Sequence, residues 1–211
     1  MRTKTAPMPV WAKAAVAAVL LIPAAAWLVD RHDRVSLQNR LAPIASEIAG
    51  RKVGVSCPGV FGRLLAPGDT AAGRVSVDAD GRVSDHTDLR TATCRELDAL
   101  VDGGRERQLA CAERSSSCGD DVQTLAWAIG TVAHESVHLR GILDEALTEC
   151  YAMQYLAFTA ERLGTTPQQA RNLALLHWET SPAKKPEQYQ APSGCEDGGK
   201  LDVRPADPVW P

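Results

Sequence analysis

A pair of histidines in a strongly periodic segment constrains this chain more than any other feature. From Asp121 onward, apolar residues recur at intervals of three and four, which is typical of a helix with one buried face. His134 and His138 lie four residues apart in this segment, so a helix would present both imidazoles on one face. Glu135 follows the first histidine and completes the pattern H-E-x-x-H. This spacing suits two imidazole ligands of one zinc ion.

A second helix is expected directly after the first. Asp144 is a good N-cap, and the helix should continue to about Leu163. Gly141 allows the chain to turn, so we expect a tight antiparallel pair of helices. Folding about residues 141–142 would place Glu145 opposite His138 and Glu149 opposite His134. Both carboxylates would then approach the imidazoles from the facing helix.

An H-E-x-x-H helix followed by a helix with E-x-x-x-E resembles the gluzincin group of zinc peptidases. Glu145 and Glu149 supply the two acids of that second pattern. The run Thr148–Ala152 also resembles the A-D-x-F-A continuation common in those peptidases. The resemblance covers about residues 121–160. The spacing between His138 and Glu145 is shorter than in most gluzincins, and the second acid is Glu rather than Asp.

The resemblance implies a zincin-like helical hairpin that carries a Zn²⁺ site. It implies His134, His138 and Glu145 as the metal ligands, and Glu149 as the carboxylate that hydrogen-bonds His134. Glu135 would be the general base that takes a proton from the zinc-bound water. The implied activity is hydrolysis of peptide bonds in a peptide or protein substrate.

The identity of the third ligand has alternatives. The sequence also fits H-E-x-x-H-x-x-G-x-x-D, the metzincin pattern, in which Asp144 would bind the metal. Metzincins need a methionine turn, and Met153, the only methionine after the motif, lies in an expected helix. Glu149 is a further alternative ligand. We expect Glu145.

Other polar side chains are weaker candidates for the site. A peptidase stabilises the developing oxyanion with its metal and a side-chain donor. The available donors are Tyr151, Tyr155, His177 and Tyr189. His177 lies in an apolar helical run, where a histidine is more often structural. His86 lies in an expected loop without a visible partner.

The N-terminus resembles an export signal. Basic residues precede the uncharged run Ala14–Val29, and a charged cluster from Asp30 ends it. We expect residues 1–30 to form an N-terminal membrane helix, as an uncleaved signal anchor in preference to a cleaved signal peptide. The protein would then be a single-pass protein of the cell membrane with an extracytoplasmic C-terminal domain; the alternative is secretion.

The six cysteines fit such a location, because disulfides persist outside the cytoplasm. None forms a CxxC pair, so structural disulfides are favoured over metal ligation. Cys111 and Cys118 bracket a short Ser-rich loop and are the best candidates for a local pair. The formal net charge of −3 provides no basic surface, so nucleic acid is not expected as a partner.

The periodicity as a whole predicts a mainly helical α+β protein. A helical stalk is expected at 31–50, the zincin-like domain at 51–180, and a Pro-rich, disulfide-held tail at 181–211. The domain should contain a small N-terminal strand region, made of Lys52–Cys57 and a hairpin of Arg74–Val77 with Arg82–Ser84, separated by a Gly- and Pro-rich loop at 59–72. Further helices are expected at Thr93–Asp102 and from Thr166 to about Trp178.

Other functions remain open at this point. An exported, disulfide-stapled envelope or binding protein could carry a zincin-like site that is structural or inactive. A membrane-anchored scaffold without metal is a third possibility.

Overall fold

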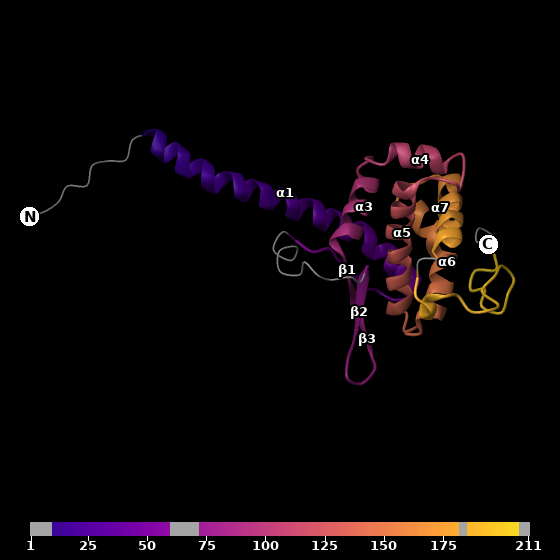
Figure 1. Ribbon diagram of the computed structural model, residues 1–211. Helices are drawn as coiled ribbons and strands as arrows, with labels where there is room; N and C mark the ends of the chain where they lie inside the picture. Colours follow the sequence, from indigo (N-terminus) through magenta and orange to yellow (C-terminus); the bar gives the residue numbers. More distant parts are fainter. Residues whose placement is uncertain (1–9, 60–71, 182–184, 207–211) are drawn as a thin grey trace, which may run out of the picture.

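A computed structural model describes residues 10–59, 72–181 and 185–206, with side chains from residue 27 onward. Figure 1 shows a bundle of helices, a small sheet at its side and one long helix that leads away to the N-terminus. In chain order the helices are α1 (Val10–Ala49), α3 (Thr91–Val101), α4 (Glu106–Ala112), α5 (Asp120–Leu139), α6 (Glu145–Arg162) and α7 (Pro167–Thr180), followed by the 3-10 turn η2 (Glu187–Tyr189). The expected mainly helical α+β class is confirmed.

The sheet has the strand order β1-β3-β2, where β1 is Gly54–Ser56, β2 is Gly73–Val77 and β3 is Val83–Leu89. β2 and β3 form the expected antiparallel hairpin, whereas β1 pairs with β3 in parallel. β2 therefore lies at one end of the sheet and pairs only with β3 among the described strands. The predicted loop at 59–72 lies almost wholly outside the described residues.

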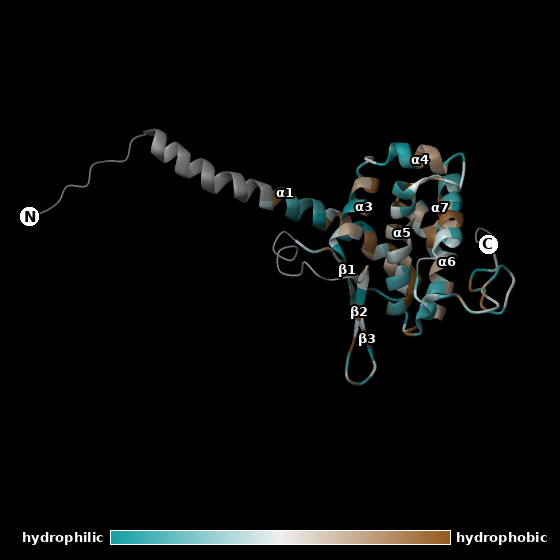
Figure 2. Ribbon diagram, in the orientation of Figure 1, coloured by the Kyte–Doolittle hydropathy of each residue, from teal (hydrophilic) through white to brown (hydrophobic). Residues whose placement is uncertain are grey.

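Helix α5 is the centre of the structure, and it packs against α1, α3, α6, α7 and the two strands β2 and β3. Its apolar side chains are buried along much of its length; Leu125 and Ile129, for example, are fully buried. In Figure 2, hydrophobic and hydrophilic residues alternate along α5, α6 and α7, as expected for helices with one buried face. The two histidines thus lie on a helix that other elements surround.

Helix α1 differs from the expected stalk in its second half. Leu37, Leu41, Ile44 and Ile48 recur at helical spacing, and all are buried in the same core as α5. The periodicity of this segment therefore reflects packing within the domain. Among the described residues, no helix is both long and apolar enough to cross a membrane. This finding does not support the expected N-terminal membrane helix, whose apolar run, Ala14–Val29, falls mainly before the first described side chain at residue 27.

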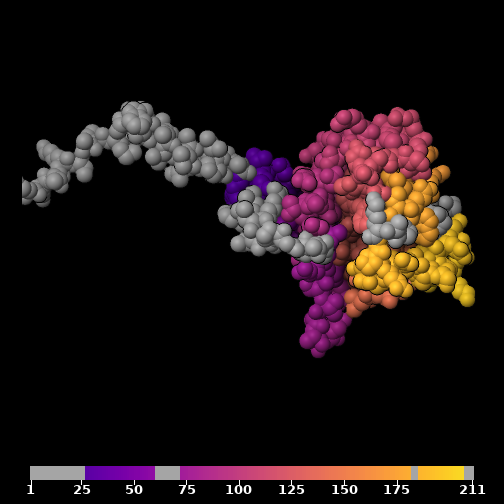
Figure 3. Space-filling view, viewed as in Figure 1, coloured from indigo at the N-terminus to yellow at the C-terminus, as the bar shows by residue number. Residues whose placement is uncertain are grey.

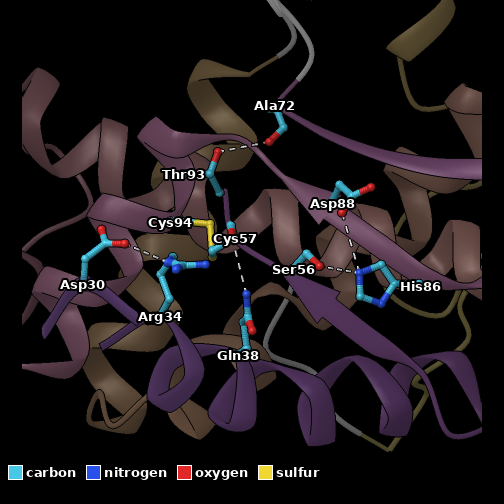
Figure 4. The surroundings of a disulfide bond; sticks show 10 residues. All are labelled: Asp30, Arg34, Gln38, Ser56, Cys57, Ala72, His86, Asp88, Thr93 and Cys94. Carbon is cyan, nitrogen blue, oxygen red and sulfur yellow. Dashed lines mark hydrogen bonds and ion pairs between the residues drawn. A yellow bond between two sulfur atoms is a disulfide. The ribbon is translucent and has the colours of Figure 1, made fainter. Parts of the chain in front are cut away.

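All six cysteines are paired, as expected for structural disulfides. The predicted local pair, Cys111 with Cys118, is confirmed. Cys57 at the end of β1 is bonded to Cys94 on α3, and Cys150 on α6 is bonded to Cys195 in the tail. Figure 4 shows that the first of these bonds lies near Thr93, whose hydroxyl donates to the carbonyl of Ala72 just before β2. The beginning of β2 is thereby fixed next to α3.

Candidate metal centre

The turn between α5 and α6 brings the two predicted helices together in antiparallel fashion. Gly141 has a φ of 101°, a left-handed conformation that favours glycine, and it follows the end of α5 closely. The guanidinium of Arg51 donates to the carbonyl of Leu139 at 3.2 Å and so satisfies one of the last carbonyls of α5. Asp144 is the N-cap of α6, and its carboxylate accepts a hydrogen bond from the Leu147 amide. Asp144 thus acts as a helix cap, and Glu145 follows on the first turn.

Three side chains converge at this turn. The Nε2 atoms of His134 and His138 lie 3.1 and 3.4 Å from the same carboxylate oxygen, Oε2 of Glu145. Together these three atoms lie within 4.8 Å of one another, so the group could hold a metal ion. The expected choice of Glu145 for this position is the one that the geometry favours, since Asp144 is occupied in capping.

The outer nitrogen of each imidazole has its own acceptor. Nδ1 of His134 lies 3.1 Å from Oε2 of Glu149, and Nδ1 of His138 lies 2.7 Å from the carbonyl of Ile142. A neutral imidazole carries one N–H, and these acceptors hold it on Nδ1. The Nε2 atom of each ring then faces the Glu145 carboxylate, and the space between them suits a proton or a cation. Two lone pairs and an anion repel one another unless a proton or a cation lies between them. Two imidazole nitrogens and a carboxylate in this arrangement form the donor set of a cation site.

The electrostatics of the group agree with this arrangement. Burial lowers the pKa of His134, but hydrogen bonds to Glu145 and Glu149 outweigh it and raise this pKa to about 9. The pKa of His138 is lowered, by burial first and then by the charge of His134. The pKa of Glu145 is lowered, chiefly by its hydrogen bond to His134. The cluster therefore favours ionised carboxylates around a shared positive charge.

Glu135 lies on the other side of the histidines, against the sheet. Its side chain is only 6% exposed, and burial raises its pKa to about 7. A Cβ atom added to Gly73 on β2 would lie 2.5 Å from Cγ of Glu135, so the glycine makes room for this carboxylate. Thr87 of β3 is a hydrogen-bond partner of Glu135. Glu135 is thus enclosed between α5 and the hairpin.

A pocket of about 650 Å³ opens over the cluster. Strand β2 contributes Gly73, Val75 and Val77 to its lining. The opposite side comes from α7 and the tail, through residues that include His177, Lys185 and Tyr189. The role of β2 and Lys185 was not predicted, because no short motif connects them with the histidines.

The weaker candidates divide into two groups. Tyr189 lies near the metal group, with its ring centre 6.0 Å from that of His134, and burial raises its pKa. His177 is buried behind Glu149, with Nε2 3.8 Å from Oε1 of the carboxylate. By contrast, Tyr151 and Tyr155 pack into hydrophobic clusters and do not line the pocket.

His86 lies on the sheet, away from the pocket lining. Its Nε2 atom is the partner of both Ser56 Oγ and Asp88, as Figure 4 shows. In a catalytic triad the serine and the acid contact different nitrogens of the histidine. This trio therefore lacks the geometry of a catalytic relay.

Comparisons of the chain with protein-family models, with curated proteins and with solved structures find no match. The functional argument consequently rests on the chain's own residues.

Proposed function

We propose that this protein is an extracytoplasmic zinc-dependent metallopeptidase. One observation carries the proposal: two imidazole Nε2 atoms and the Glu145 carboxylate converge beside a second, buried carboxylate, that of Glu135. Two histidines and one acid are a common ligand set of catalytic zinc sites, which leave a further position open. Gluzincin peptidases share this ligand set and the i, i+4 spacing of the histidines.

The two nitrogen–oxygen separations of the cluster support zinc. Bonds of about 2.0–2.2 Å in a tetrahedral site put neighbouring ligand atoms about 3.3–3.6 Å apart. The nitrogen–oxygen distances of 3.1 and 3.4 Å in the cluster are close to that range. A bound zinc ion would supply Lewis acidity, which polarises a carbonyl group and lowers the pKa of a coordinated water towards neutrality.

Glu135 would carry the proton transfer. Its enclosure by α5 and β2 keeps its pKa near neutrality, where a carboxylate can both accept and release a proton. It would accept a proton from the attacking water and deliver it to the leaving amine. Tyr189, at the edge of the same pocket, is available as a hydrogen-bond donor to the developing oxyanion.

A peptide substrate is favoured by the strand that borders the pocket. β2 is the end strand of the sheet and lines the pocket beside Glu135. An extended peptide can add to such an edge through backbone hydrogen bonds. The exposed side chains of Val77 and Leu143 offer apolar contacts at the pocket rim.

The proposed location follows from the disulfides and the N-terminal sequence. Three disulfides are compatible with an oxidising, extracytoplasmic compartment. The basic flank and apolar run at the N-terminus favour export and attachment to the cell membrane. We therefore place the domain outside the cytoplasm, next to the membrane.

The test combines metal analysis with hydrolysis. The purified full-length protein should contain one equivalent of zinc by elemental analysis and should cleave an unfolded protein substrate. Chelation should abolish cleavage, and zinc should restore it. Zinc without cleavage of any peptide would favour a binding protein with a structural site, and failure to take up zinc would overturn the proposal.

A further inference from the structure

The carboxylate of Glu149 is held from both sides. Its Oε2 atom faces His134, at 3.1 Å from Nδ1. Its Oε1 atom accepts a hydrogen bond from the ammonium of Lys185 and another, at 3.4 Å, from the hydroxyl of Ser181. His177 lies behind the same oxygen at 3.8 Å. Glu149 therefore connects two parts of the protein: its Oε2 atom orients His134, and its Oε1 atom is bound by residues of α7 and the tail.

The side chain of Lys185 is largely buried, unlike that of a typical surface lysine. Its side chain is only 14% exposed, and its ammonium lies 5.1 Å from the centre of the Trp127 ring. Burial of an ammonium is costly unless an opposite charge compensates it. Glu149, whose side chain is 4% exposed, supplies that charge. The two residues form an enclosed ion pair directly behind the metal group.

The tail that carries Lys185 is fixed at two adjacent points of α6. Lys185 is bound to Glu149, and Cys195 is bonded to Cys150, the next residue of the helix. Tyr189, between these two attachments, reaches the ring of His134. Figure 3 shows the tail as a layer of yellow atoms against the helices of the bundle. The segment from 185 to 195 therefore borders the metal group on one side.

We propose that Lys185 is a positioning residue of the metal site, acting through Glu149 on His134. By holding Oε1, the ammonium fixes the carboxylate in the rotation that directs Oε2 at Nδ1 of His134. Without it, Oε1 keeps only the longer contacts with Ser181 at 3.4 Å and His177 at 3.8 Å, so the carboxylate is held less firmly and His134 loses a fixed acceptor. The inference rests on the proposed function only in requiring that the group binds zinc.

The experiment measures zinc affinity of the full-length protein by competition with a chromophoric chelator. Lys185→Met retains the length of the side chain and removes its charge. Loss of partners beyond the ligands typically weakens metal binding by about 10–100-fold, and we expect about 10-fold here, because Lys185 acts through one intermediate residue. Lys185→Arg should recover most of the affinity. Lys200→Met, an exposed lysine of the same tail, is the matched control and should bind zinc like the wild type.

A double-mutant cycle separates this role from simple structural support. In a Glu149→Gln background, Lys185→Met should cause no further loss of zinc affinity, since its route to His134 is already removed. Additive losses, or a Lys185→Met variant with unchanged zinc affinity and only a lower melting temperature, would overturn the inference. Circular dichroism establishes that each variant is folded.

The outcome also distinguishes this inference from the peptidase proposal. Wild-type protein that binds zinc but cleaves nothing removes the peptidase and leaves the role of Lys185 to be decided by the cycle. Wild-type protein that binds no zinc removes both.

Discussion

Nδ1 of His134 lies 3.1 Å from Oε2 of Glu149, a residue one helical turn beyond the carboxylate that faces Nε2 of the same ring. One histidine is thus bounded by two acids of the facing helix, four residues apart. Glu149 holds the proton on Nδ1, and this leaves the Nε2 lone pair for a cation. The pKa of Glu149 is held far below its usual range, because hydrogen bonds from the histidines and the charge of Lys185 outweigh the effect of burial. The acid therefore stays ionised at neutral pH.

Replacement of Glu149 should weaken the metal site without emptying it. Glu149→Ala leaves the three proposed ligands in place but removes the acceptor that orients His134. We expect zinc affinity to fall about 10–100-fold, which is typical for such outer partners. Glu161→Ala, an exposed acid on the same helix, should bind zinc like the wild type. Complete loss of zinc from Glu149→Ala would make Glu149 a ligand instead.

Glu145→Ala and Asp144→Ala should differ in kind although the residues are adjacent. Glu145→Ala removes the carboxylate that both Nε2 atoms face, so zinc should be lost almost entirely. Asp144→Ala removes the cap of α6, which costs about 0.5–2 kcal/mol of stability, with zinc retained. Zinc content and chemical denaturation of both variants provide the comparison. A zinc-free Asp144→Ala beside a zinc-loaded Glu145→Ala would favour the metzincin-like pattern.

Glu135→Gln should separate metal binding from hydrolysis. The amide has nearly the same shape but cannot accept a proton, so the variant should keep its zinc and lose cleavage. General-base catalysis typically contributes about 10²–10⁴-fold to the rate, and the loss should fall in that range. Hydrolysis at the wild-type rate would show that Glu135 is not the base.

The helical half of the site could be predicted because its information is local. The i, i+4 spacings of the histidines and of the two acids, with Gly141 between them, determine which side chains can face one another. The expected contact of Glu149 with His134 is present. Glu145 lies between both histidines instead of opposite His138 alone, since it is on the first turn of α6 and close to the end of α5.

The other half of the site depends on contacts that are distant in sequence. Gly73 and Glu135 meet only because the hairpin packs across α5, and Lys185 reaches Glu149 only because the tail folds back along α6. Neither of these two contacts produces a periodic pattern in the sequence. Similarly, the spacing of apolar residues on α1 shows that one face of the helix is buried but not what covers that face. Packing within the domain therefore could not be distinguished from a stalk by sequence.

Two of the three disulfides should contribute unequally to stability. In the loop-closure model, the bond that joins Cys57 to Cys94, 37 residues apart, is worth about 4 kcal/mol. The bond that joins Cys111 to Cys118, 7 residues apart, is worth about 2 kcal/mol. Paired Cys→Ser variants, compared by chemical denaturation, should show this order. Mass spectrometry of the non-reduced protein should find no free thiol; six free thiols in exported protein would contradict the pairing.

Gly73→Ala should impair catalysis while it spares the metal. The added methyl group would lie 2.5 Å from Cγ and 2.7 Å from Oε1 of Glu135. Both distances are shorter than a van der Waals contact allows, so the glutamate must move. Because Glu135 is buried between α5 and the sheet, its carboxylate would be displaced from the reacting water. A displacement of about 1 Å can cost about 100-fold in rate, and we expect a loss of that order.

Zinc content should remain at the wild-type level in Gly73→Ala, since the three atoms nearest to the added methyl group all belong to Glu135 and not to a proposed ligand. Gly119→Ala is the matched control: its methyl group would meet only Asp121, at 3.5 Å, an ordinary contact, and hydrolysis should be unaffected. The Gly73→Ala, Glu135→Gln double variant supplies the last arm. If Gly73 acts only by leaving room for the Glu135 carboxylate, Gly73→Ala should add little to the loss that Glu135→Gln already causes. A Gly73→Ala variant that hydrolyses as fast as the wild type would mean that Glu135 does not work from the position it occupies beside β2.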